Sequence, residues 1–359
     1  MNQVIIIPAF EPDNRLIDYI IDLQLHDFMQ IVVIDDGSGM DYDAIFNSVR
    51  TIGADVIRYP LNRGKGVAIK CGIRAAIKKY GEDVSIITAD SDGQHLVSDV
   101  VKISDALEEK EDVLILGTRG FSGADVPWKS KWGNRFTSFF FKLTNGISCP
   151  DTQTGLRGIP SSLTTLALEE DGSRYEYEMN FLMDAAVTAK FKYIPIETVY
   201  ENNNASSHFR PFRDSLRVYG RMIRFTLSSL TGAVADYTLF FILTMCFTFP
   251  HVQTIFAATI LARLGSGVVN FQMNRHFSFR SKEPATMQAS RYFVLFVGQM
   301  ILSAGFVSLL SYVVPSLLAK IIIDTVLFFI SYILQKRWVF KKGVIHEKEK
   351  EKILVGDHI

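Results

Sequence analysis

The sequence predicts an α/β domain with a mostly parallel sheet, followed by an all-α domain of four transmembrane helices. Two observations lead to this prediction. Short β-branched apolar runs alternate with helix-period segments as far as residue 200, and long apolar runs replace them afterwards. The 359 residues include 38 basic and 38 acidic side chains, yet residues 225–335 carry only nine charges. A charged soluble part joined to a membrane part explains this distribution.

Five apolar runs are predicted as strands, and two amphipathic segments between them as helices. Strands this uniformly apolar are buried on both faces, which is typical of parallel sheets covered by helices. The strands are expected at Val4–Ile7, Ile31–Ile34, Asp55–Tyr59, Val84–Thr88 and Val113–Leu116 and the helices at Asp13–Leu25 and Gly66–Lys79.

Polar clusters follow three of these strands. Glu11 and Asp13 come after the first, Asp35-Asp36-Gly37-Ser38 after the second, and Asp90-Ser91-Asp92 after the fourth. Ligands in parallel sheets bind beyond the carboxyl ends of the strands, so a binding site is expected at this edge.

The pair Asp90 and Asp92 suits one hard divalent cation, Mg²⁺ or Mn²⁺, that also holds a diphosphate. Such pairs occur by chance in surface loops, but the position at a strand end favours a site. Lys65, within Asn62-Arg63-Gly64-Lys65-Gly66, opens a helix and could bring a cation and backbone N–H groups to phosphate. A simple helix N-terminus is the alternative.

Four later segments are long enough to cross the hydrocarbon core of a bilayer. The first three are 225–249, 252–273 and 292–314, and the fourth is 316–335. Lys and Arg gather in the 274–291 connection and after residue 335, which places both ends in the cytosol. The N-terminus also lacks the basic and apolar regions of a signal peptide. The three cysteines are expected as reduced thiols.

Residues 270–279 match residues 331–340, 61 positions later, which predicts two related helical hairpins. The same offset relates Arg263 to Asp324, and we expect them to form an ion pair within the membrane, because either charge alone is costly there. Separate contacts with water or lipid headgroups are the alternative.

Two basic segments are expected as helices at the membrane surface. One carries arginines at spacings of three and four and leads into the first span. The other spans residues 132–143, with aromatic residues between basic ones. General attraction to anionic lipid is the alternative role of the arginines, which are Arg210, Arg213, Arg217, Arg221 and Arg224.

Four motifs in order resemble the family 2 glycosyltransferases with a GT-A fold, closest to the polyprenyl-phosphate sugar synthases, similar to dolichyl-phosphate mannose and glucose synthases. The resemblance covers about residues 3–215. The motifs are Pro8-Ala9-Phe10, Asp35-Asp36-Gly37-Ser38, Asn62-Arg63-Gly64-Lys65-Gly66 and Asp90-Ser91-Asp92-Gly93-Gln94.

This resemblance implies a role for each of a set of residues. Pro12 stands where the family has a glutamate, so whether Glu11 or Asp13 replaces it stays open. Nucleotide contacts are expected from Pro8, Glu11, Asp13, Asp36, Lys65 and Asp90. Metal ligands are expected at Asp90, Asp92 and Gln94, and catalytic roles at Asp92, Asp151 and Glu178. The phosphate of the acceptor is expected to bind to Arg119, Arg135, Arg210 and Arg213.

The second half resembles the GtrA-like family, on Arg224-Phe225 with Gly232 and Asp236 and on the two repeats. This resemblance implies export of lipid-linked sugars, with flipping of the product by the membrane domain. Its polar candidates are Asp236, Arg263, Lys320 and Asp324.

Together these features predict a metal-dependent, inverting transfer of one hexose, glucose favoured, from a UDP-sugar to polyprenyl (undecaprenyl) phosphate for cell-surface glycan synthesis. The enzyme is expected in the plasma membrane, with no nucleic-acid partner and a homo-oligomer left open. A lipid-sugar transporter with an inactive transferase domain and a processive polysaccharide synthase are the alternatives. The predicted parts are 1–208 (transferase), 209–224 (basic amphipathic helix), 225–342 (membrane domain) and 343–359 (charged cytosolic tail).

Overall fold

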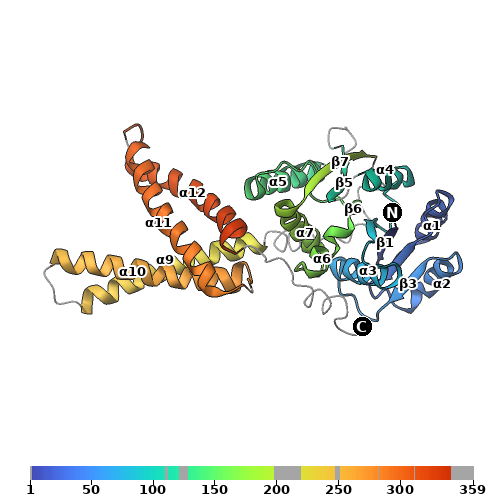
Figure 1. The fold of residues 1–359 in the computed structure, drawn as a ribbon, viewed down its shortest axis with the longest axis horizontal. Helices are drawn as coiled ribbons and strands as arrows, with labels where there is room; N and C mark the ends of the chain where they lie inside the picture. Colours follow the sequence, from blue (N-terminus) through green and yellow to red (C-terminus); the bar gives the residue numbers. More distant parts are fainter. Residues whose placement is uncertain are drawn as a thin grey trace. The chain divides into compact units, whose positions relative to one another are not determined.

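The described part of the chain forms two compact units, one ending at residue 197 and the other beginning at residue 220 (Figure 1). Arg210, Arg213 and the predicted tail lie outside the described residues. The structure, a computed structural model, describes residues 2–109, 112–120, 128–197, 220–246, 251–281, 283–310 and 312–340.

The N-terminal unit is built on one seven-stranded sheet with the order β3-β2-β1-β4-β6-β5-β7. All neighbouring strands are parallel except β6, which runs antiparallel to both β4 and β5. The strands are β1 Gln3–Ala9, β2 Ile31–Asp35, β3 Asp55–Arg58, β4 Ser85–Thr88, β5 Val113–Arg119, β6 Arg157–Ile159 and β7 Lys190–Ile196. The helices are α1 Arg15–Leu25, η1 Met40–Tyr42, α2 Asp43–Thr51, α3 Lys65–Tyr80, α4 Val97–Glu109, α5 Trp128–Asn145, α6 Ser161–Glu169 and α7 Tyr175–Thr188.

The five predicted strands and both predicted helices are present, because their apolar residues form the core. Every residue of β2 is buried, as expected for a strand covered on both faces. The apolar patterns did not predict β6 and β7. The first is only three residues long, and the second is mostly half-buried with lysines among its apolar residues.

Alternate side chains of β1 face two different layers of helices. Ile5 and Ile7 join the core cluster with Leu16 and Ile20 of α1. On the other face, Gly72 of α3 lies so close to the sheet that a Cβ there would approach Ile6 Cγ2 to 2.5 Å. The glycine therefore lets α3 pack directly on β1, which brings the N-terminus of α3 to the carboxyl edge of the sheet.

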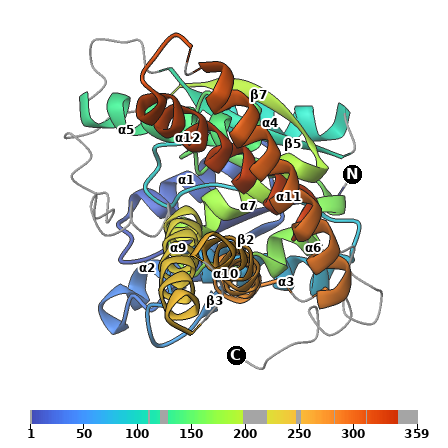
Figure 2. The same cartoon turned by 90° about the vertical axis from the view of Figure 1, so that its left-hand side faces the viewer.

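The C-terminal unit consists of two helical hairpins, α9–α10 and α11–α12 (Figure 2). The second helix of each hairpin ends in a five-residue π-helical turn, and the hairpins diverge from these ends (Figures 1 and 2). The elements are α9 Gly220–Cys246, α10 His251–Met273, η3 Asn274–Ser278, α11 Ala285–Leu310, α12 Ser316–Leu334 and η4 Gln335–Val339.

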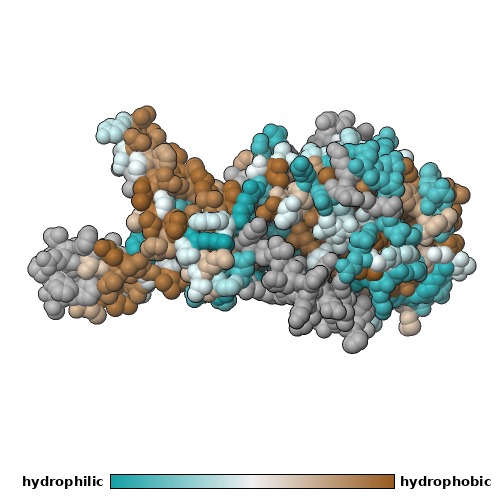
Figure 3. Space-filling view, in the orientation of Figure 1, coloured by the Kyte–Doolittle hydropathy of each residue, from teal (hydrophilic) through white to brown (hydrophobic). Residues whose placement is uncertain are grey.

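Apolar surface covers these helices, in contrast to the N-terminal unit (Figure 3). Among the described residues, Ile223–Cys246 and Ala285–Leu310 are long and apolar enough to cross a membrane, by length and composition. The predicted spans 252–273 and 316–335 are helices as well, as α10 and α12.

The internal repeat appears as an approximate twofold relation between the hairpins. Asn274 and Gln335, 61 residues apart, occupy the first position of each π-helical turn, and Asn274 Nδ2 donates to Gln335 Oε1 at 2.9 Å. The ring contacts are reciprocal, because Phe271 corresponds to Tyr332 in the repeat and Phe279 to Phe340. The ring centroids of Phe271 and Phe340 are 5.8 Å apart, and those of Phe279 and Tyr332 are 5.9 Å apart. The two repeats therefore meet through equivalent residues.

A buried network of neutral side chains joins the hairpins at this end, and we call it the interhairpin clasp. Ser278 binds both Ser228 and Asn274, and Asn274 also donates to Asn270. Tyr292 of the second hairpin donates to Asn270 at 2.8 Å. The clasp comprises Ser228, Asn270, Asn274, Ser278, Tyr292, Gln299, Ser331 and Gln335.

The predicted ion pair between Arg263 and Asp324 is wrong. Arg263 Nη1 lies 3.7 Å from Asp236 of α9, whereas Asp324 accepts a hydrogen bond from Ser303 of α11 at 2.7 Å. Each charge thus finds its partner on the adjacent helix of its own hairpin, because the hairpins diverge at this level. Lys320 belongs to α12, and its side chain is outside those described.

Candidate active site

The strand register brings the polar loops together at one edge of the sheet. Ala9 of β1 pairs with Asp35 of β2, and Ile6 pairs with Thr88 of β4. β1 and β2 therefore end at the same height and β4 ends three residues earlier, and the loops after them lie at one edge of the sheet, as the sequence predicts.

Asp36 holds the glycine-rich loop in place. Its carboxylate accepts the backbone N–H of Arg63 at 2.7 Å and of Gly64 at 2.8 Å. These two amide donors are thus used within the protein. Burial raises the pKa of the Asp36 carboxyl above its usual range, against the effect of these hydrogen bonds.

Gly64 is required where this loop meets the start of α7. Its φ is +100°, and a Cβ there would approach Ser173 O to 2.4 Å. One residue along, Gly66 lies equally close to Tyr177. The two glycines let the start of α3 pack against the start of α7, which places Lys65 beside Glu178.

Lys65 joins two acidic residues from different elements. Its Nζ lies 2.7 Å from Asp90 and 3.2 Å from Glu178. Burial disfavours the charge of Lys65, but Asp90 and Glu178 together raise its pKa above the usual range. Likewise, burial opposes ionisation of Asp90, but the charge of Lys65 holds the pKa of that carboxyl well below its usual range. Lys65 is a cation and Asp90 an anion at neutral pH.

Asp92 has the opposite electrostatic character. Burial and the neighbouring charge of Asp90 raise the pKa of the Asp92 carboxyl. Its Oδ1 accepts the backbone N–H of Gln94 at 3.1 Å. Two carboxylates that destabilise each other's charge are the arrangement that a divalent cation relieves, so this pair fits the expected metal.

His95 is a site residue that the sequence analysis missed. It is buried, and its Nδ1 accepts the backbone N–H of Asp90 at 3.1 Å. Burial lowers the pKa of the imidazole, so it is neutral and carries its proton on Nε2. His95 thus fixes the backbone that carries Asp90. A single histidine after the acidic motif gave no periodic or spacing signal.

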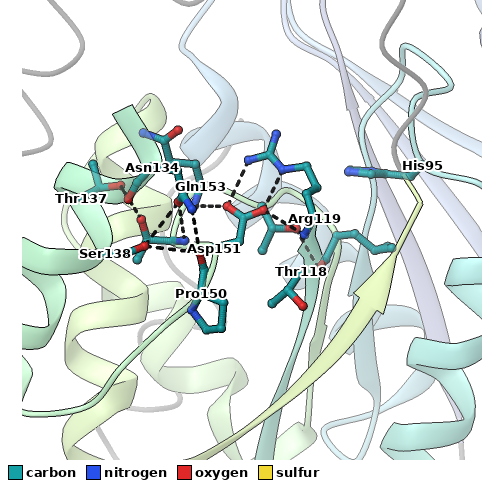
Figure 4. Close-up of polar contacts among 12 residues, drawn as sticks. His95, Thr118, Arg119, Asn134, Thr137, Ser138, Pro150, Asp151 and Gln153 are labelled. Carbon is teal, nitrogen blue, oxygen red and sulfur yellow. Dashed lines mark hydrogen bonds and ion pairs between the residues drawn. The ribbon is translucent and has the colours of Figure 1, made fainter. Parts of the chain in front are cut away.

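A second ionic pair lies at the end of β5 (Figure 4). Arg119 Nε donates to Asp151 Oδ2 at 2.7 Å, and Arg119 Nη2 donates to Oδ1 at 3.0 Å. Asp151 is fully buried and also accepts the backbone N–H of Gln153. This geometry favours a role in positioning Arg119 over direct contact with substrate.

The segment that follows Asp151 also contacts the acidic pair. A Cβ on Gly155 would lie 2.4 Å from Asp90 Oδ2, so only glycine fits against that carboxylate. Thr88 Oγ1 donates to the Gly155 carbonyl at 2.7 Å and holds it there. The two motifs are therefore parts of one site.

The remaining predicted residues differ in their exposure and contacts. Asp13 is exposed and forms a two-point ion pair with Arg15, whereas Glu11 has φ +51° and donates its backbone N–H to Ser38 Oγ. Glu11 is thus the acid less engaged by its neighbours. Pro8 is half-buried in β1, and Arg135 is exposed on α5.

The protein itself offers few metal ligands. Within the described ranges, no three His, Cys, Asp or Glu residues converge on one point. A cation at Asp90 and Asp92, with the Gln94 amide nearby, would need its other ligands from substrate or water.

Comparisons with known proteins agree with this geometry. Residues 4–163 match the model of glycosyl transferase family 2, and residues 224–340 match the GtrA/DPMS transmembrane domain.

Two curated archaeal proteins are similar over slightly more than half of the chain. An uncharacterised protein of Methanocaldococcus jannaschii, MJ1222, is 31% identical over 208 residues, 56% of this chain and 83% of that protein. The UDP-N-acetylglucosamine–dolichyl-phosphate N-acetylglucosaminyltransferase of Methanococcus voltae is 26% identical over 219 residues, 55% and 85%. Among solved structures, glucosyl-3-phosphoglycerate synthase from Mycobacterium tuberculosis is 16% identical with a TM-score of 0.45, covering 62% of this chain and 76% of that one. The chain therefore belongs to glycosyl transferase family 2, carries a GtrA/DPMS transmembrane domain, and is a membrane-associated glycosyltransferase.

Proposed function

We propose that this glycosyltransferase transfers one hexose, glucose first, from a UDP-sugar to undecaprenyl or a related polyprenyl phosphate, with inversion. We place the reaction at the cytosolic face of the plasma membrane, with four spans and both chain ends in the cytosol, in cell-surface glycan synthesis. The observation that carries the proposal is the charged row Glu178–Lys65–Asp90, next to Asp92 and to the Arg119–Asp151 pair.

The donor side of this row suits a nucleoside diphosphate. Asp90 and Asp92 would hold Mg²⁺ or Mn²⁺, which would supply positive charge to the diphosphate leaving group. Lys65 is charged and already aligned by Asp90 and Glu178, so it adds a second positive charge without reorganising. His95 keeps Asp90 in place through the backbone. Glu11 and Asp36 are proposed for the uridine.

The acceptor side calls for cations rather than a base. A lipid phosphate is largely dianionic at neutral pH, so it is a competent nucleophile without losing a proton. Arg119, with its orientation fixed by Asp151, is proposed to bind this phosphate, together with Arg135, Arg210 and Arg213. The phosphate oxygen then attacks the anomeric carbon as the bond to UDP breaks, which inverts that carbon.

The name of the Methanococcus voltae relative pairs a UDP-sugar with dolichyl phosphate. That pairing supports a UDP-sugar donor and a polyprenol-type phosphate acceptor here. It also makes N-acetylglucosamine the main alternative to glucose as the transferred sugar.

The test uses the purified full-length chain with undecaprenyl phosphate, Mg²⁺ or Mn²⁺, and a panel of UDP-sugars. UDP release and mass spectrometry of the lipid should show one added sugar. EDTA should stop the reaction, and adding back the metal should restore it. A folded protein that releases no UDP with any donor contradicts the proposal, and lipids with many sugars would indicate a processive synthase.

A further inference from the structure

Arg263 occupies an unusual position for a charged side chain. It lies ten residues before the end of α10 at Met273 and twelve after its start at His251, so about 15 Å and 18 Å from the two ends. Its side chain is nevertheless 59% exposed. If α10 crosses the bilayer, as the proposed function requires, this guanidinium lies in the hydrocarbon region, where an exposed charge is costly.

The protein does little to satisfy this guanidinium. Arginine has five N–H donors. Within the described part of the chain, the Arg263 side chain has a single ionic neighbour, Asp236, at 3.7 Å, which is too long for a good hydrogen bond. Asp236 in turn accepts a hydrogen bond from Ser266 at 3.0 Å. Several donors therefore have no acceptor among the described residues.

The helix face that carries Arg263 is the one that meets the second hairpin. Asn270 and Asn274 follow Arg263 by seven and eleven residues, two and three turns on the same face, and both bind residues of the other hairpin. Gly267 follows Arg263 by one helical turn, and a Cβ on it would contact the Phe296 ring of α11 at 3.7 Å. Beyond this contact the hairpins diverge (Figure 1), so Arg263 lies where they begin to separate.

The two repeats differ in charge at the position of Arg263, where the second repeat has Asp324. Asp236 and Ser303 are 67 residues apart, as are the dipeptides Arg224-Phe225 and Arg291-Tyr292. Each hairpin therefore has a carboxylate–hydroxyl contact here, Asp236 with Ser266 and Ser303 with Asp324. Only the first hairpin adds an arginine, at the position where the second has Asp324. The second hairpin has its own cation, Lys320, four residues before Asp324, so the two hairpins differ in where their charges lie rather than in their number.

We infer that Arg263 binds the phosphate of a membrane lipid between the two hairpins. A lipid phosphate brings several acceptor oxygens, matches the guanidinium in charge, and reaches this depth with its chain still in the bilayer. The inference rests on the proposed function for the four spans. The polyprenyl phosphate acceptor, or the product made from it, is the lipid that this enzyme must handle, and bulk phospholipid offers the same chemistry.

The test measures lipid retention by the full-length chain in phosphatidylcholine nanodiscs. The nanodiscs contain either undecaprenyl phosphate or phosphatidylglycerol at one mole fraction, and native mass spectrometry counts the lipids that stay bound. Arg263→Gln should weaken retention about tenfold, the loss of one or two charge-assisted hydrogen bonds. Asp236→Asn should strengthen it, because it removes a competing negative charge.

Leu264→Ala, an exposed apolar neighbour on α10, is the matched control and should retain lipid like the wild type. A loss confined to undecaprenyl phosphate assigns the site to the acceptor, and an equal loss of both lipids assigns it to phospholipid. Wild-type retention by Arg263→Gln, with an unchanged thermal midpoint, overturns the inference. UDP release by the wild type reports separately on the proposed function, so the two failures are distinguishable.

Discussion

The two units bury polar side chains in opposite ways. At the edge of the sheet, Lys65, Asp90 and Glu178 form a charged row beside Asp92, whose charge is disfavoured by its surroundings. In the C-terminal unit, the interhairpin clasp consists of neutral amides and hydroxyls that bind one another. Both sets are largely inaccessible, but only the first retains charge that a ligand can neutralise.

This contrast indicates that the edge of the sheet serves the reaction and that the interhairpin clasp stabilises the fold. A neutral network with its hydrogen bonds made within the protein fixes a geometry and has little left for a substrate. Two neighbouring carboxylates such as Asp90 and Asp92 are costly to ionise together until a cation arrives. Substitutions should therefore change turnover at the edge of the sheet and stability at the clasp.

The largest effect is expected at Asp92. Asp92→Asn should reduce transfer by at least about a thousandfold, because the amide cannot supply the negative charge that a divalent cation requires. Product formation with saturating UDP-sugar and Mn²⁺ measures it. The thermal midpoint should stay near the wild-type value. Turnover that survives would mean that the metal is held elsewhere.

Arg119 combines both behaviours. Arg119→Ala leaves Asp151 buried without its ionic partner, which should cost about 3 kcal/mol of stability and also impair use of the lipid acceptor. Thermal unfolding of the full chain and the KM for undecaprenyl phosphate measure the two effects. Lys79→Ala, which breaks an exposed ion pair with Asp55, is the control for losing a cation. An unchanged midpoint for Arg119→Ala would contradict the proposed positioning by Asp151.

The clasp should respond in stability alone. Asn274→Leu removes the donor to Gln335 Oε1 and to Asn270 Oδ1 and should cost about 2 kcal/mol. Gln335→Leu should behave similarly, and the double variant should lose about 1 kcal/mol less than the sum. Thermal unfolding of the four variants measures this coupling. Additive losses would show that the two residues do not act together.

The smallest effect concerns Asp36 and pH. Burial raises the pKa of this carboxyl, so the folded protein holds its proton more tightly than the unfolded chain does. Stability should therefore fall as the pH rises from about 4, the usual aspartate value, through the raised pKa. Asp36→Asn lacks this slope, so its thermal midpoint relative to the wild type should rise with pH. A difference that stays constant from pH 4 to 7 would contradict this assignment.

Much of the fold can be predicted from local sequence patterns. The β-branched runs predict β1 to β5 because burial on both faces leaves little choice of residue. Strand β6 is three residues long and antiparallel, and its pairing depends on β4 and β5, which lie far away in sequence. No local pattern carries that information.

The site divides along the same line. The motifs place Lys65, Asp90 and Asp92 at one edge because strand ends align in parallel sheets. The partnerships of Lys65 with Glu178 and of Arg119 with Asp151 depend on how α7 and β5 pack, so the sequence does not reveal them. The mistaken Arg263–Asp324 pair has the same cause: the repeat relates two positions, but it does not bring them together.

The two π-helical turns also set the rotational phase of the residues behind them. A π-helical turn holds one residue more than an α-helical turn, so everything after it is rotated by about 100° relative to an uninterrupted α-helix. In this phase Phe279 and Phe340, 61 positions apart, stack at 5.0 Å. Deleting a single residue from Asn274–Ser278 would turn Phe279 away from Phe340. The ring contact between the two repeats would then be lost. The extra residue in each repeat thus rotates the aromatic residue that follows it, so that Phe279 and Phe340 face each other across the two hairpins.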